Sequence, residues 1–112
     1  MLKKIIVDGQ ECEISIIGLC HKGDSGNYKL NFGKKINFDL QTMSEELKKT
    51  FEIDKFHKLF LIIKKGPVSI SIAKHGKIML EKVNPDKPEV AFALAEMVLK
   101  TIPGYEGTVE SH

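Results

Sequence analysis

The second half of this chain contains the pattern that most restricts its fold. Three largely apolar segments, at residues 57–64, 67–74 and 77–83, follow one another with short turns at Gly66-Pro67 and His75-Gly76. The middle segment alternates between aliphatic and small residues, a period of two that is typical of strands. Connections this short join antiparallel neighbours. We therefore expect a three-stranded antiparallel meander.

The N-terminal half shows a similar arrangement. Residues 2–7 form a short apolar segment, Asp8-Gly9 is a strong signal for a tight hairpin turn, and residues 11–17 alternate between apolar and polar side chains. A glycine-rich loop is expected at residues 18–26. Residues 28–32 alternate again and predict a third strand.

Apolar side chains at spacings of three and four residues predict two helices. The first covers residues 39–51, where Asp39 can cap the first turn and Thr42 with Glu45 offers a second possible start. The second begins near Pro88, with Asp86 as its expected cap, and ends before Pro103-Gly104.

Together these elements predict an α+β fold in the order βββα-βββα, with two helices packed on one face of an antiparallel sheet. The 112 residues leave room for one domain. We place it at residues 1–104, with an N-terminal hairpin and loop at 1–26 and a polar C-terminal tail at 105–112. Three placements of the hairpin stay open: it can extend the sheet, cover its exposed face or pair with another chain.

Composition narrows the classes of function. All 17 basic residues are lysine, and they nearly balance 15 acidic residues, for a net charge of +2. A chain without arginine is poorly equipped to read base sequence but can still contact phosphates. A lysine-preferring proteome, such as that of a thermophile, explains the same composition.

Location is predicted from what the sequence lacks. No apolar stretch is long enough for a transmembrane helix, and the opening residues do not have the pattern of a signal peptide. The cysteines lack metal-ligand spacing, which fits a reducing compartment. We therefore expect a cytoplasmic protein that does not bind membranes.

One strand of the meander breaks the alternation expected when helices cover only one side of a sheet. If Leu59, Leu61 and Ile63 face the helices, Phe60 and Ile62 face outward. An apolar centre on an exposed sheet face usually marks an interface, although cover by the N-terminal hairpin is the alternative. We call this surface the open face, and its candidate partner-binding residues are Phe60, Ile62, Ser69, Ser71 and Met79.

Residues 27–102 resemble one half of a TATA-box-binding protein in the order and spacing of their elements. The matching positions are the strand at 28–33, Asp39-Leu40 opening a helix, Phe56 before the meander, Gly66-Pro67 at its turn, Gly76-Lys77 opening the last strand, and the helix at 88–101. The resemblance implies a curved sheet backed by helices, and it motivates nucleic-acid binding through Phe56, Lys64 and Lys77.

Three positions depart from that family. Ala73, Ile62 and Glu81 stand where the family has a phenylalanine, an arginine and a threonine. Glu81 brings a negative charge that opposes DNA. A complete saddle would also need two copies of this chain.

We predict no catalytic residues, no metal ligands and no cofactor, because no combination of reactive side chains has suitable spacing. Cys12 is expected to be buried, and Cys20-His21 lacks a second ligand pair. His57 and His75 are expected at one end of the sheet. The loop at 23–26 lacks the following helix that phosphate binding requires.

Three hypotheses result. The first is a non-catalytic binding module that contacts a protein, or a second copy of itself, through the open face. The alternative is weak, sequence-nonspecific binding of nucleic acid. A third is a small enzyme whose site is assembled in space from His57, His75 or Cys20.

Overall fold

The computed structural model describes residues 1–23 and 25–109, and the side chains of residues 20–22 lie outside this description. Within these residues the chain forms an eight-stranded sheet and two helices. The strands are β1 (Leu2–Val7), β2 (Gln10–Lys22), β3 (Ser25–Phe32), β4 (Glu52–Phe56), β5 (Phe60–Lys65), β6 (Val68–Ala73), β7 (Lys77–Val83) and β8 (Tyr105–Val109), and the helices are α1 (Leu40–Leu47) and α2 (Pro88–Leu99).

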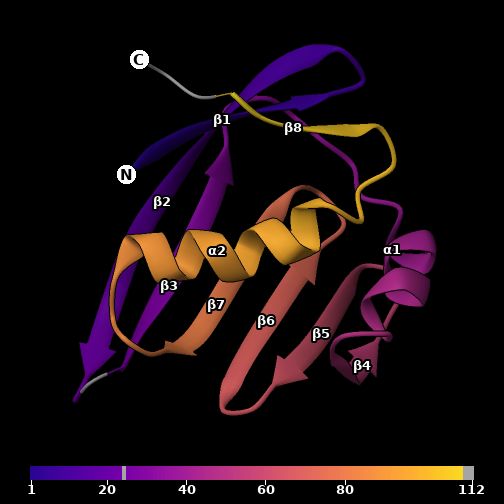
Figure 1. Cartoon of the computed structure of the whole chain (residues 1–112). Helices are drawn as coiled ribbons and strands as arrows, with labels where there is room; N and C mark the ends of the chain where they lie inside the picture. Colours follow the sequence, from indigo (N-terminus) through magenta and orange to yellow (C-terminus); the bar gives the residue numbers. More distant parts are fainter. Residues whose placement is uncertain (24, 110–112) are drawn as a thin grey trace.

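All the strands form one sheet in the order β4-β5-β6-β7-β3-β2-β1-β8. Every neighbouring pair is antiparallel. The predicted meander is therefore present as β5-β6-β7, and β7 joins it to β3. Figure 1 shows α2 lying across the sheet in front of β3 and β7, with α1 beside β4 and β5.

The N-terminal hairpin extends the sheet. Its two strands pair from Leu2 with Ser15 to Val7 with Gln10, around the turn at Asp8 and Gly9, which both have positive φ. This confirms the predicted tight turn. The hairpin lies edge to edge with β3 through β2, so among the three open placements the structure selects extension of the sheet.

The predicted order βββα-βββα is wrong, because the chain adds β4 before the meander and β8 after α2. The expected helix at 39–51 ends at Leu47, and β4 begins five residues later. In β4 only Ile53 is half-buried, so the strand shows no alternation. The sequence of β8 also gives a weak strand signal, because it contains glycine and glutamate, yet β8 pairs with β1.

Two segments expected to be irregular are therefore strands. Residues 105–109 form β8 instead of a polar tail, while residues 110–112 lie outside the described residues. The expected loop at 18–26 is mostly strand, because β2 continues to Lys22 with a register shift between Gly18 and Cys20. Backbone pairing outweighs the weak strand propensity of these glycine-containing segments.

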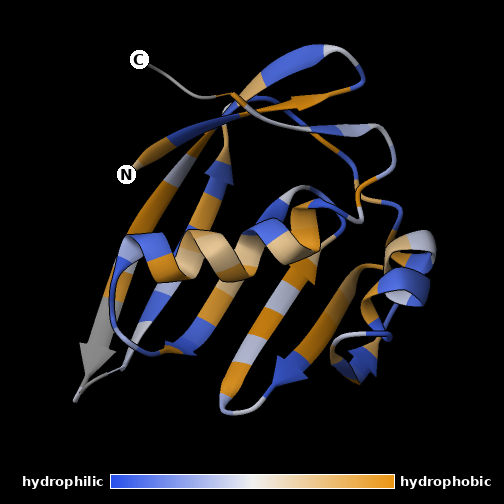
Figure 2. Cartoon of the chain, in the orientation of Figure 1, coloured by the Kyte–Doolittle hydropathy of each residue, from blue (hydrophilic) through white to orange (hydrophobic). Residues whose placement is uncertain are grey.

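One face of the sheet is buried together with both helices. In β6, buried residues alternate with half-buried ones, and Figure 2 shows this as alternating bands of hydropathy. The helices contribute Leu40, Met43 and Leu47 from α1 and, from α2, Ala91, Phe92, Ala95, Val98 and Leu99 to the same core. The opposite face of the central strands carries neither helix.

The two predicted helix caps have different outcomes. Asp39 caps α1, because its carboxylate accepts hydrogen bonds from the hydroxyl and backbone N–H of Thr42 at 2.8 and 3.2 Å. These bonds, the hydroxyl's above all, lower the pKa of Asp39. Asp86 does not cap α2, which begins after Lys87 with no side-chain cap. Its carboxylate instead accepts a hydrogen bond from the Tyr28 hydroxyl.

Candidate binding face

The predicted partner-binding residues lie side by side on β5, β6 and β7. In the strand register Ile62 is opposite Ser71, and Ser71 is opposite Met79, so these three form a row across the sheet. Lys29 of β3 continues the row beside Met79. All four side chains are half-buried, and they alternate with fully buried neighbours that face the helices.

Phe60 lies one step from this row and is opposite Ala73. Its ring stacks on the imidazole of His57 with centroids 4.8 Å apart and an interplanar angle of 19°. The ammonium of Lys55 lies 5.8 Å from the ring centre. Phe60 is thus held in place on one side and half-exposed on the other.

His57 therefore has a structural environment. Its Nδ1 accepts a hydrogen bond from the backbone N–H of Leu59 at 3.1 Å, in the turn that joins β4 to β5. His75 lies in the turn between β6 and β7. The two turns are at the same end of the sheet, as predicted for these histidines.

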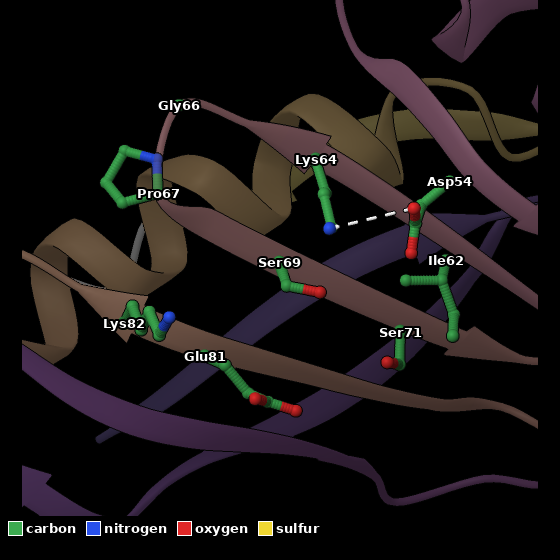
Figure 3. Close-up of a pocket in the computed structure, with 9 residues that line it drawn as sticks. All are labelled: Asp54, Ile62, Lys64, Gly66, Pro67, Ser69, Ser71, Glu81 and Lys82. Carbon is green, nitrogen blue, oxygen red and sulfur yellow. Dashed lines mark ion pairs between the residues drawn. The ribbon is translucent and has the colours of Figure 1, made fainter.

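A hollow of about 470 Å³ lies at the other end of the open face. Figure 3 shows its lining, in which Ser69 and Ser71 of β6 lie between the Asp54–Lys64 ion pair and Glu81. The ion pair joins carboxylate and ammonium at 3.6 Å. The lining residues are Asp54, Ile62, Lys64, Gly66, Pro67, Ser69, Ser71, Glu81 and Lys82.

A bulge in β7 places two charges in succession at this hollow. Tyr28 is opposite Leu80 but Gly26 is opposite Val83, so β7 has one residue more than β3 between these pairs. Lys82 adopts a positive φ of 62°, and its backbone N–H donates to the side-chain oxygen of Asn27 at 3.1 Å. As a result Leu80 and Val83 are both buried while the intervening Glu81 and Lys82 are both exposed.

The residues predicted for nucleic-acid binding are not brought together. Phe56 is 45 % exposed but lies opposite Leu61, whose side chain faces the helices. Lys64 is engaged by Asp54. Lys77 is exposed on the open face, opposite Ala73 and Asn31.

Charges of both signs are interleaved on the open face. Lys77, Met79 and Glu81 follow one another along the same side of β7 as a basic, an apolar and an acidic residue. Neither Lys77 nor Glu81 forms an ion pair within residues 1–23 and 25–109. A face with mixed charges attracts a partner of mixed charge better than a polyanion.

Other candidate chemistry finds little support in the described parts of the chain. They contain no group of three histidine, cysteine or acidic residues that could hold a metal ion. Cys12 has a free thiol and is buried, as predicted. The side chains of Cys20-His21, and Asp24 of the glycine-rich loop, lie outside the described residues. No described helix has the length and apolar character needed to cross a membrane.

Several lining residues of the hollow were missed by sequence reasoning. Asp54 could be found only by recognising β4, and Lys82 only by anticipating the bulge that turns it outward. Gly66-Pro67 was recognised as a turn but not as part of a site. The alternation of Lys77, Met79 and Glu81 was visible in the sequence and would have identified the charge pattern.

Comparisons with protein-family models, with curated proteins and with solved structures found no match to this chain. The resemblance of residues 27–102 to half of a TATA-box-binding protein therefore stays a prediction.

Proposed function

We propose that this chain is a non-catalytic binding module that contacts protein through its open face. The observation that carries the proposal is the row of Ile62, Ser71 and Met79, with Phe60 beside it, on a sheet face that neither described helix covers. Burying the apolar side chains of Phe60, Ile62 and Met79 yields about 1.5–3 kcal/mol each when burial is complete. Half-buried side chains retain part of this gain for a partner.

The proposal places the module in the cytoplasm. Cys12 fits this location, because it is buried and forms no disulfide within the described residues. A reducing compartment keeps thiols in this state. A test of function must therefore maintain reducing conditions.

We expect the methyl groups of Ile62 and Met79 to report partner binding in NMR spectra. The probes are the unlabelled chain itself and a nuclease-treated extract of the source cells, each added to methyl-labelled protein. Signals of Ile62 and Met79 should shift or broaden, while that of Ile70, which is fully buried, should not. Phe60→Glu should abolish the response, because it places a charge on the surface that the partner would bury beside Ile62.

Phe56→Glu is the matched control, since Phe56 is an exposed phenylalanine outside the open face. It should retain the response of the wild type. An unchanged Ile70 signal verifies that each variant is folded. If Ile62 and Met79 respond to neither probe, or if Phe60→Glu responds like the wild type, the open face is not the binding surface.

Nucleic-acid binding is the alternative, and it predicts a different signature. Contacts to phosphates would give saturable binding to a labelled AT-rich duplex that weakens steeply between about 50 and 200 mM salt. We expect no saturable change in anisotropy at either salt concentration, because Asp54 engages Lys64 and Glu81 lies on the same face as Lys77. Steep salt dependence that Lys77→Ala reduces would instead establish the alternative.

A further inference from the structure

On the open face, the side chains of Lys77, Met79 and Glu81 of β7 form a pattern that is complementary to itself when reversed. Met79 lies midway between Lys77 and Glu81 on the open face. If a second β7 runs antiparallel above the first, Met79 meets its own copy, and each Lys77 meets the Glu81 of the other chain. One such arrangement therefore forms the same ion pair twice.

The neighbouring strands permit this arrangement. On β6, Ser71 meets its own copy and Ser69 meets Ala73, so small side chains let the two sheets approach. On β5, Ile62 meets its own copy, and Lys64, whose ammonium pairs with Asp54, comes opposite Phe60.

We infer that the open face binds a second copy of this chain, face to face, about a two-fold axis that runs along the row of Ile62, Ser71 and Met79. This inference rests on the proposed function and names the partner. Such a contact is isologous, because the same patch serves both subunits. Packed sheets cross at about 30°, so the pairing is closest near the axis.

The size of the patch sets the expected strength. Strands about 4.8 Å apart with same-face residues about 6.8 Å apart give β3, β5, β6 and β7 roughly 400 Å² of sheet plane, against about 800 Å² per partner in a standard interface. At the two ends of the row, Lys29 and Lys55 meet their own copies and weaken the contact. The dimer should therefore be weak, with a dissociation constant in the micromolar range or above.

Sedimentation equilibrium of charge variants, over roughly 1 µM to 1 mM protein, tests the inference. Wild-type protein should show a monomer–dimer equilibrium. Lys77→Glu and Glu81→Lys should each weaken dimerisation at least about tenfold, because each replaces two attractive pairs by two repulsive ones. The double variant Lys77→Glu/Glu81→Lys should restore dimerisation, and an equimolar mixture of the two single variants should associate more strongly than either alone.

The controls are Lys100→Glu at the end of α2 and Glu45→Lys on α1, which change the net charge equally at exposed positions outside the open face. They should dimerise like the wild type. A wild type that stays monomeric throughout, or a double variant no better than the single ones, overturns the inference. In that case a response of the Ile62 and Met79 methyls to cell extract alone would still support the proposed function. If the protein stays monomeric in sedimentation and these methyls do not respond in the NMR titrations, both the dimer and the proposed function are overturned.

Discussion

Ile63→Ala will lower the free energy of unfolding by about 2–5 kcal/mol, while Ile62→Ala will lower it by about 1 kcal/mol or less. The two isoleucines are adjacent in β5 but point to opposite faces of the sheet. Ile63 is fully buried against the helices, so its truncation leaves a cavity. Ile62 is half-buried on the open face, where water can occupy the space that its side chain vacates.

Chemical denaturation at low protein concentration measures both changes without a contribution from dimerisation. In the association experiments the order of the two effects should be reversed. Ile62→Ala should weaken binding through the open face, and any folded fraction of Ile63→Ala should bind normally. Equal losses of stability for the two variants would contradict the separation of the sheet into a buried and an exposed face.

The turns and alternations of the central strands were predictable because local chemistry specifies them. Asp8-Gly9 supplies two residues that tolerate positive φ, and Gly66-Pro67 separates two apolar strands. The period of two in β6 then determines which side chains share a face. Phe60 and Ile62 could be assigned to the open face by the same logic.

The edges of the sheet were not predictable, because their pairing depends on distant residues. β8 is a strand only because β1 offers it an edge, about a hundred residues away in sequence. β4 is likewise held by β5 and contains a register shift between Ile53 and Lys55. Such segments have weak strand propensity, which tertiary context overrides.

In the candidate site, the sequence predicted the row of Ile62, Ser71 and Met79 but not the hollow with its charged lining residues. Period-two alternation places Ser69, Ser71 and Met79 on one face. The bulge in β7 breaks that period, so Glu81 and Lys82 are both exposed. The prediction that Asp86 caps α2 was also wrong, because its carboxylate accepts a hydrogen bond from Tyr28 of β3, which is far away in sequence.

The second large effect is expected at Gly26, beneath the loop that leads into α2. A Cβ at this position would overlap the carboxylate of Asp86, which accepts the hydroxyl hydrogen bond of Tyr28. Gly26→Ala must therefore displace Asp86, and we expect a loss of about 1–3 kcal/mol in the free energy of unfolding. Gly18→Ala is the matched control, because its Cβ would only reach ordinary contact with the Tyr28 ring at 3.6 Å.

A double-mutant cycle and a pH series identify the cause. In an Asp86→Ala background, Gly26→Ala should lower the free energy of unfolding clearly less, because the overlapping carboxylate is gone.

Burial of the ring, followed by the hydrogen bond and negative charge of Asp86, raises the pKa of Tyr28 from 10.0 to about 12.

The raised pKa means that the fold favours the neutral phenol. The contribution of Tyr28 to stability is therefore complete below pH 10 and is lost as the pH rises through 10 to about 12. The difference in unfolding free energy between wild type and Tyr28→Phe should be constant at neutral pH and shrink across that interval, while effects of the lysines cancel in the comparison. A difference that stays constant to pH 12 would show that the fold does not raise the pKa of Tyr28. Equal costs of Gly26→Ala in both backgrounds would show that the Asp86 carboxylate is not what the added Cβ displaces.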